Sequence, residues 1–384
     1  MNKVRLGIVG VGGMGTAHAR EVLDKKVNRC ELTAVCDIDP KQLAKFDNSV
    51  QKFEDSRALV RSGAADAVLI ATPHYGHTTV GVDALQHGVH VLTEKPISVH
   101  KADCERLIAA ANKNKKLVFA AMFNQRTDPH YQKLRKLVQS GELGEITRVT
   151  WLITDWFRTE FYYSSGTWRA TWKGEGGGVL LNQCPHNLDL LQWIAGMPCR
   201  VRGFCALGKR HHIEVEDEVT AYLEYPNGAT GTFVTTTGEA PGTNRLEIAG
   251  DNGKVLLEGG RILFMRNEMP MFKFSRTVKA SFASPGVWNI EIPAYGSGGQ
   301  HLEIKQNFVN AILDGEPLLA PGREGIHSVE LANAMLYSSL TGKTVDLPMD
   351  GRAYETLLKK LIRESKFRKK EGHGQSDDLS KSWR

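Results

Sequence analysis

A glycine-rich turn near the N-terminus has the spacing that binds a dinucleotide. Gly10, Gly12 and Gly15 fit the pattern G-x-G-x-x-G directly after the apolar segment Val4–Val9. In such a turn the first glycine bends the chain, the second lets a pyrophosphate approach, and the third packs a helix against the sheet. The start of that helix favours anions. The alternative is a glycine turn without a ligand. We expect the cofactor to contact Gly10, Gly12, Gly13, Met14 and Gly15.

An acidic residue follows at the end of the second expected strand. Asp37 closes the segment Leu32–Asp37, where a carboxylate would bind the hydroxyls of the adenosine ribose. A carboxylate at this place repels a 2′-phosphate, and the next two residues, Ile38 and Asp39, are not basic. The sequence therefore predicts NAD, with NADP less favoured.

The first third of the chain alternates strand-like and helix-like segments. The expected strands are Val4–Val9, Leu32–Asp37, Ala67–Ala71, His90–Thr93 and Leu117–Met122. The helical patterns between them are Gly15–Lys25, Thr78–Gln86 and Lys101–Asn112. This order predicts an α/β fold with right-handed crossovers, a doubly wound parallel sheet that forms a Rossmann domain over residues 1–123.

The remaining chain has a different pattern. Strands joined by glycine-containing turns, such as Ala221–Tyr225 and Ala229–Thr237, extend to about Pro293. The helices and the long strand expected around them are His130–Val138, Ile146–Trp156, a helical stretch that ends near Gly196, Leu302–Leu313, Ile326–Leu340 and Tyr354–Glu364. We expect a C-terminal α+β domain over residues 124–366 with a large, mostly antiparallel open sheet. Residues 367–384 are polar and charged, and we expect a disordered tail.

A lysine follows the expected strand His90–Thr93, at the sheet edge where open α/β folds bind ligands. A carbon gives up hydride only as its hydroxyl loses a proton, so an amine or imidazole nearby lowers the barrier. Burial beside the positive nicotinamide would lower the pKa of Lys95 toward neutrality. A surface lysine before a turn proline is the alternative.

These motifs resemble the Gfo/Idh/MocA family of sugar and cyclitol oxidoreductases. The resemblance rests on the glycine turn, the segment 72–77, the Glu-Lys-Pro motif at 94–96, and three glycines at 176–178 followed by His and Asp. It implies that Lys95 contacts the substrate hydroxyl and the nicotinamide ribose, and that Pro96 follows a cis peptide. The further cofactor-binding residues that it implies are Thr72, Pro73, His77, Glu94, Lys95, Pro96, Asn124, Trp168 and Arg169.

The resemblance also points to residues 182 and 186. Members similar to inositol dehydrogenase place an Asp and a His there, whereas this chain has Asn182 and His186. On one continuous helix this spacing puts both side chains on one face, with His186 as the expected proton acceptor. Asn182 carries no charge, so Lys95 would take more of the acid–base work. Pro185 either kinks this helix or begins it.

Aromatic and basic residues gather between positions 151 and 173, which include Trp151, Trp156, Trp168 and Trp172. Aromatic faces with hydrogen-bonding groups suit a pyranose, although an aromatic cover of the domain junction is the alternative. Asp189 could orient His186, bind substrate or pack against the sheet. The expected catalytic residues are Lys95, His186 and Asn182. The expected substrate-binding residues are Lys95, Arg126, Asp155, Trp156, Arg158, Tyr163, Asn182, His186 and Asp189.

The composition limits which partners and which cellular compartment we expect. The chain of 384 residues has 49 basic and 43 acidic residues without a basic stripe, so we expect no nucleic-acid partner. No apolar run reaches the roughly 18 residues that a membrane helix needs, and no secretory signal precedes the first strand. We therefore expect a cytoplasmic protein without a membrane partner. The cysteines form no C-x-x-C pair. The adjacent His211 and His212 fall in an expected loop before a strand, and adjacent histidines rarely point the same way on a strand, so we expect no metal site. The large sheet favours a homodimer or homotetramer.

These observations favour an NAD(P)-dependent dehydrogenase that acts on a CH–OH group of a sugar, glycoside or cyclitol. An NAD-dependent glycoside hydrolase that oxidises a ring carbon transiently is one alternative. A non-catalytic dinucleotide sensor is another, but the presence of both Lys95 and His186 argues against it.

Overall fold

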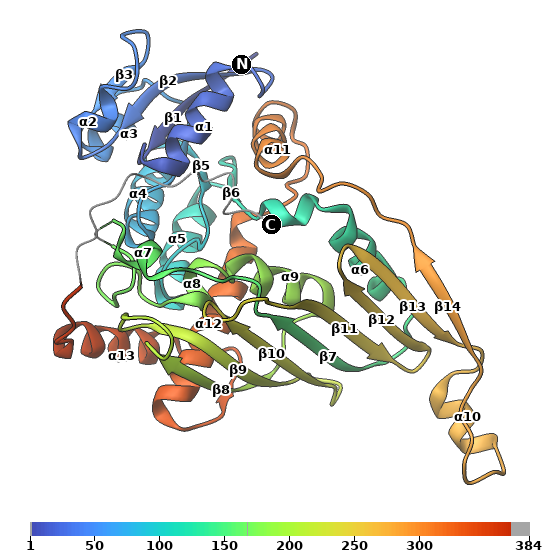
Figure 1. The fold of residues 1–384 in the computed structure, drawn as a ribbon. Coiled ribbons are helices and arrows are strands. Elements are labelled where there is room, and N and C mark those ends of the chain that lie inside the picture. The colour runs from blue at the N-terminus through green and yellow to red at the C-terminus, as the bar shows by residue number, and fades with distance from the viewer. Residues whose placement is uncertain (1, 167, 370–384) are drawn as a thin grey trace.

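The computed structural model describes residues 2–166 and 168–369 and builds them around two sheets (Figure 1). In this part of the chain, a parallel sheet of six strands has the order β3-β2-β1-β4-β5-β6. Its strands are β1 (Val4–Val9), β2 (Cys30–Cys36), β3 (Gln51–Phe53), β4 (Ala67–Ile70), β5 (His90–Thr93) and β6 (Phe119–Ala121). The strand order reverses between β1 and β4, which opens a ligand crevice at the carboxyl ends of the strands. The predicted Rossmann sheet is confirmed.

The crossovers of this sheet contain the helices α1 (Gly13–Leu23), α2 (Pro40–Leu43), α3 (Ser56–Arg61), α4 (His74–Gln86) and α5 (Lys101–Lys113). The central strand β4 is buried along its whole length, as expected of a parallel strand covered on both faces. The short elements α2, β3 and α3 were not predicted. They span few residues, and β3 is largely exposed, so it leaves no apolar run in the sequence.

The second sheet is mixed and mostly antiparallel. Among the described residues its nine strands have the order β14-β13-β12-β11-β7-β10-β9-β8-β15. They are β7 (Ile146–Ile153), β8 (Arg200–Leu207), β9 (Glu216–Glu224), β10 (Thr230–Thr236), β11 (Asn244–Gly250), β12 (Gly253–Glu258), β13 (Arg261–Asn267), β14 (Val287–Ile292) and β15 (Val345–Asp346). Only the pair of β7 and β10 is parallel among these described strands. The prediction of a large, mostly antiparallel sheet is confirmed.

Helices cover one face of this sheet and leave the other open. Burial alternates along β9, and Phe204 and Tyr222 stand exposed on the open face. The helices of this part are α6 (Pro129–Gln139), α7 (Glu160–Ser164), α8 (Val179–Asn182), α9 (Pro185–Ala195), α10 (Met271–Thr277), α11 (Gln300–Asp314), α12 (Gly325–Thr341) and α13 (Gly351–Glu364), with short 3₁₀ turns at Asn124–Thr127 and Gly322–Glu324. Helix α12 contacts both β8 and α5, so it lies between the two sheets (Figure 1). None of the helices that the structure describes is long and apolar enough to cross a membrane.

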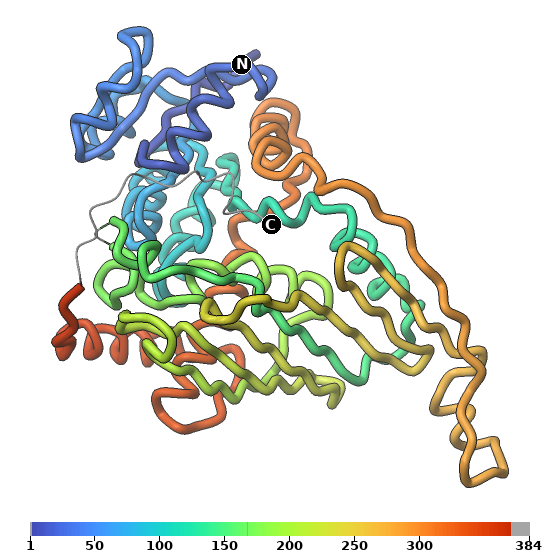
Figure 2. The backbone as a smooth tube through the Cα atoms, viewed as in Figure 1, coloured from blue at the N-terminus to red at the C-terminus, as the bar shows by residue number. Residues whose placement is uncertain are grey.

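The chain returns to the Rossmann sheet after the second sheet. Figure 2 shows α11, in orange, beside the N-terminal segment in blue. Hydrogen bonds join the two segments: Gln306 Oε1 accepts from the backbone N–H of Asn28 at 2.7 Å, and Arg29 contacts Asp314. The expected tail lies outside the described residues from position 370 onward. Lys369 is described, and its Nζ donates to the backbone oxygen of Arg169 at 3.2 Å.

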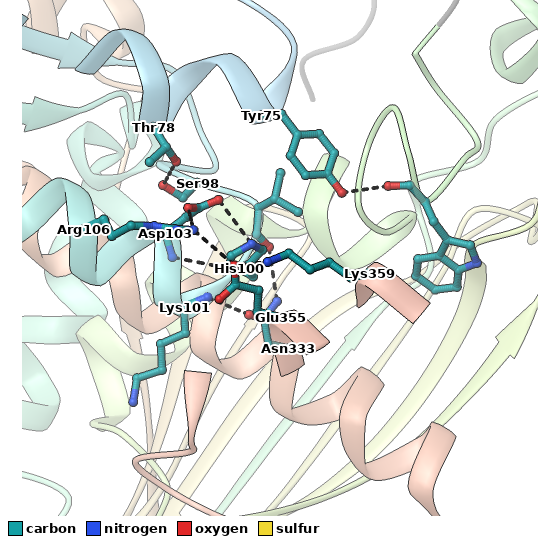
Figure 3. Close-up of polar contacts among 12 residues, drawn as sticks. Tyr75, Thr78, Ser98, His100, Lys101, Asp103, Arg106, Asn333, Glu355 and Lys359 are labelled. Atoms are coloured by element: carbon teal, nitrogen blue, oxygen red, sulfur yellow. Dashed lines mark hydrogen bonds and ion pairs between the residues drawn. The ribbon is translucent and has the colours of Figure 1, made fainter. Parts of the chain in front are cut away.

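A polar network ties α5 to the last two helices (Figure 3). The backbone N–H of Lys101 donates to Asn333 Oδ1 at 2.9 Å, and Arg106 connects Asp103 with Glu355 of α13. The Lys101 ammonium is itself buried, 3.1 Å from Glu330, and donates to Met349 O at 2.6 Å. These contacts hold the Rossmann sheet against the helices that cover the second sheet.

Lys101→Met should destabilise the protein, because it leaves the carboxylate of Glu330 buried without its cation. The cost for such a pair is about 3–5 kcal/mol, measured as the free energy of unfolding in urea. The matched control is Lys101→Met/Glu330→Leu, which removes both charges and should recover part of the loss. A single variant as stable as the parent protein would contradict this role.

Candidate active site

A cavity of about 640 Å³ lies at the carboxyl ends of β1, β2, β4 and β5. Residues of the second part of the chain close its other side. The cavity brings together the following predicted residues: Gly10, Gly12, Gly13, Met14, Asp37, Thr72, Pro73, His77, Glu94, Lys95, Trp156, Arg158, Trp168, Arg169, Asn182 and His186.

The glycine turn has the shape that a pyrophosphate needs. Gly10 has a φ of +87°, and a Cβ there would lie 2.8 Å from the backbone of Ala71. A Cβ at Gly15 would lie 1.8 Å from Gly10 O, so α1 can pack this closely only with glycine. A Cβ at Gly12 would meet nothing within 4 Å, and no side chain caps α1 there. The open space before the first N–H groups of α1 therefore fits the phosphates of a dinucleotide.

Asp37 lies at the adenosine end of the cavity. Its Oδ2 accepts a hydrogen bond from the backbone N–H of Val11 at 2.8 Å, and its Oδ1 accepts from Asp39 N at 3.0 Å. Glu54 and Asp55 line the same end, and none of the described lining residues there is basic. This acidic end offers no partner to a 2′-phosphate.

Lys95 reaches across the cavity from the end of β5. Its Nζ donates to the backbone oxygen of Asn182 at 2.8 Å, and burial lowers the pKa of its amine. The Lys95–Pro96 peptide is cis. The ring nitrogens of His77 lie 2.7 Å from Pro96 O and 2.8 Å from Thr72 O, so this histidine ties two cavity loops together.

Asn182 and His186 line the cavity from two helices rather than one. Helix α8 ends at Asn182, and α9 begins at Pro185. Of the two alternatives for Pro185, the structure has the start of a new helix, because proline is tolerated at the first helical position. Asn182 and His186 therefore do not share one face of a single continuous helix. The imidazole of His186 is buried, and burial together with the charge of Lys95 holds its pKa well below the usual value. His186 is therefore neutral near pH 7 and able to accept a proton.

A chain of buried polar groups connects the cavity to α11. Glu94 Oε1 lies 2.8 Å from His18 Nε2, and His18 Nδ1 lies 3.1 Å from Lys305 Nζ. Lys305 also contacts Glu21 of α1. The sequence indicated none of these partners, because they come from segments far apart in the chain.

Arg126 and Asp189 lie outside the cavity lining and bind each other. Their two hydrogen bonds measure 2.6 and 2.7 Å, both side chains are almost fully buried, and Arg126 also contacts Glu324. This pair joins the 3₁₀ turn after β6 to α9. The other predicted residues outside the lining are Gly15, Pro96, Asn124, Asp155 and Tyr163. Tyr163 donates from its hydroxyl to Thr237 Oγ1 at 2.7 Å, and Asn124 Nδ2 donates to Gln300 Oε1 at 2.6 Å.

Sequence patterns missed several residues at the reactive end. Tyr162 and Gln183 line the cavity there. The hydroxyl of Tyr162 donates to Asn182 Oδ1 at 3.2 Å, and Gln183 Nε2 donates to that hydroxyl at 3.0 Å. Glu175 lies behind Asn182 and accepts a hydrogen bond from its amide. The sequence contains one indication of Tyr162, which is its position beside the predicted Tyr163. It contains no indication of Glu175.

Comparison with known families matches both parts of the chain. The family described as "Oxidoreductase family, NAD-binding Rossmann fold" matches residues 4–122. The family described as "GFO/IDH/MocA C-terminal domain" matches residues 131–256. The matched ranges contain the glycine turn, Lys95, Asn182 and His186.

Similar proteins are named as dehydrogenases. The chain is 25% identical to levoglucosan dehydrogenase of Pseudarthrobacter phenanthrenivorans over 91% of this chain and 99% of that enzyme. It is 34% identical to inositol 2-dehydrogenase of Salmonella paratyphi B over 37% of this chain and 43% of that enzyme. The WlbA dehydrogenase of Bordetella pertussis, solved with NADH and UDP-GlcNAcA, has a TM-score of 0.75 at 27% identity, over 91% of this chain and 100% of that chain.

The family matches and the similar solved structure agree with the fold built above. They cover the parallel sheet with its dinucleotide turn and the part of the chain that contains the mixed sheet. Together these findings show that the chain belongs to the Gfo/Idh/MocA family of NAD-binding oxidoreductases.

Proposed function

We propose that this protein is a dehydrogenase that moves a hydride between NAD and a hydroxyl-bearing carbon of a sugar, glycoside or cyclitol. The observation that carries the proposal is the meeting of Lys95 and His186 in the cavity that the glycine turn opens. The Lys95 amine lies 2.8 Å from Asn182 O, four residues before the imidazole. An acid–base pair thus stands at the reactive end of a dinucleotide site.

The chemistry assigned to these residues is proton transfer. Bound NAD⁺ supplies the hydride acceptor. Burial favours the neutral forms of both Lys95 and His186, so either can take the proton from the substrate hydroxyl. The amide of Asn182 and the hydroxyl of Tyr162 lie in the same part of the cavity and orient the substrate hydroxyl by hydrogen bonds.

The lining of the reactive end suits a sugar or cyclitol ring. The guanidinium of Arg158 lies 5.5 Å from the ring centre of Trp156, and that of Arg169 lies 4.5 Å from the ring centre of Trp168. Aromatic faces pack on the C–H faces of such a ring, while the guanidiniums and Tyr162 bind its hydroxyl rim. The relatives named for levoglucosan and inositol support this substrate class.

We also propose that the protein assembles as a homodimer or homotetramer. The open face of the second sheet exposes Phe204 and Tyr222, and a partner would remove them from water.

Gly12→Ala should keep the fold and weaken NADH binding at least about tenfold, because the new methyl group occupies the space before α1. Binding is measured by NADH fluorescence and folding by the melting temperature. Gly15→Ala is the comparison: its Cβ would clash with Gly10 O, so it should lower the melting temperature as well. Unchanged NADH affinity in Gly12→Ala would place the pyrophosphate elsewhere.

Asp37→Ser should reduce the difference between the affinities for NADH and NADPH. Removing the carboxylate removes its repulsion of a 2′-phosphate and its bonds to the ribose hydroxyls. Dissociation constants for NADH and NADPH, measured for the parent and the variant, should show tight NADH binding by the parent and a smaller difference in the variant. A parent protein that prefers NADPH would refute the assignment.

The dehydrogenase proposal is tested by the absorbance at 340 nm with NAD⁺ and a panel of pyranoses, glycosides, levoglucosan and inositols. At least one should give stoichiometric NADH, and Lys95→Met should lower the rate by about 10²- to 10⁴-fold while NADH still binds. A panel without any NADH formation would contradict the proposal. Glycoside cleavage without net NADH would indicate transient ring oxidation instead.

A further inference from the structure

A buried carboxylate lies behind Asn182, directly before the three glycines. The side chain of Glu175 is almost fully buried in the turn that joins Ala170 to this segment. Its Oε2 accepts from the backbone N–H of Ala170 at 2.9 Å, and its Oε1 accepts from the amide nitrogen of Asn182. The carboxylate is therefore bound on both oxygens, and one of them holds a cavity residue.

This contact decides which way the amide of Asn182 points. A carboxylate only accepts hydrogen bonds, so Nδ2 of Asn182 must face Glu175 and Oδ1 must face the other way. Oδ1 then accepts from the hydroxyl of Tyr162 at 3.2 Å, on the cavity side. An aspartate at position 182 would instead put two carboxylates in contact, which is unfavourable. Glu175 is thus compatible with asparagine at this position.

The same carboxylate acts on the lysine. Lys95 Nζ donates to the backbone oxygen of Asn182, and the negative charges of Glu94 and Glu175 raise its pKa while burial and the charges of Arg158 and Arg169 lower it. Burial raises the pKa of Glu175 to about 7, so Glu175 is a carboxylate above neutral pH. The other groups that face or contact Glu175 are His74, Tyr163, Arg169, Glu216 and Lys369.

We propose that Glu175 is a positioning residue of the acid–base site: it orients the amide of Asn182 and supplies a negative charge that acts on Lys95. The proposal rests on the proposed dehydrogenase function. When the substrate hydroxyl passes its proton to Lys95, the amine becomes an ammonium, and the carboxylate of Glu175 stabilises it. The hydride leaves the same carbon, so the product is the carbonyl compound.

The decisive variants exchange the two groups. Glu175→Gln removes the negative charge. The amide nitrogen of the introduced glutamine would then face the amide nitrogen of Asn182. Because two donors cannot bind each other, the amide of Asn182 would turn over and point Nδ2 toward Tyr162. In Glu175→Gln/Asn182→Asp the amide and the carboxylate change places: the introduced glutamine can still accept from Ala170 and now donates to the introduced aspartate. Glu216→Gln is the matched control, since this carboxylate is also buried and accepts a hydrogen bond from Leu180 N of α8 at 3.0 Å without touching residue 182.

The first measurement needs no substrate. The pH dependence of acetylation of Lys95 by acetic anhydride, read by mass spectrometry on the NADH complex, gives the pKa of its amine. In Glu175→Gln this pKa should fall by about one unit, because a nearby negative charge is lost. It should return toward the parent value in the exchanged double variant and stay unchanged in Glu216→Gln. An unchanged pKa in folded Glu175→Gln would overturn the proposal, whether or not any sugar is oxidised.

The second measurement follows turnover with levoglucosan or myo-inositol, whichever the parent oxidises. Glu175→Gln should lower kcat at least about tenfold and alter the pH dependence of kcat. The exchanged variant should recover most of the lost kcat. Melting temperatures separate a folding defect from a catalytic one. If Glu175→Gln does not fold, the exchanged variant decides alone: parent-like activity supports the proposal, and a folded but inactive protein refutes it.

Discussion

The hydrogen bond from Lys95 Nζ to the backbone oxygen of Asn182 joins the two halves of the active site. The lysine comes from the end of a Rossmann strand, and the oxygen ends a short helix of the second part of the chain. The two can meet because the glycine segment between Glu175 and α8 packs unusually close to its neighbours. A Cβ at Gly178 would lie 1.9 Å from Glu216 O, and a Cβ at Gly176 would lie 2.1 Å from a methyl group of Val99. Side chains at these positions would push α8 away from the lysine.

Charge at this junction is balanced over several segments. Arg158 and Arg169 bring positive charge near Lys95, while Glu94 and Glu175 bring negative charge. Each carboxylate is held by hydrogen bonds, Glu94 by His18 and Glu175 by the amide of Asn182. Buried charges need such partners, because desolvation alone would neutralise them. The proposed proton-transfer groups therefore depend on buried residues behind them.

The sequence predicted the parts of the structure that follow from local pattern. Strands β1 and β5 were placed with the observed bounds, because short, mainly apolar segments between turn residues are typical of buried parallel strands. The glycine turn, Asp37 and Lys95 could be proposed as site residues because each lies at a fixed offset from such a strand. The parallel pairing of β7 with β10 could not be foreseen, since the alternation of side chains is the same in parallel and antiparallel pairs.

Long-range polar contacts were beyond the sequence. Arg126 and Asp189 are 63 positions apart, and the sequence around each of them does not show that they bind each other rather than a sugar. Lys305 likewise depends on His18, which lies 287 positions away in the sequence. Pro185 was recognised as a break, but only the structure separates a kink from the start of a new helix.

The partner of the lysine is a main-chain atom, and every amino acid carries that atom. Mutation of codon 182 can therefore change the charge and size of the side chain without releasing Lys95. A lineage with this architecture could lose an acidic residue at one position, acquire another on the preceding loop, and keep a working enzyme at each step. The backbone contact thus lets Lys95 keep its place when the side chain at position 182 changes.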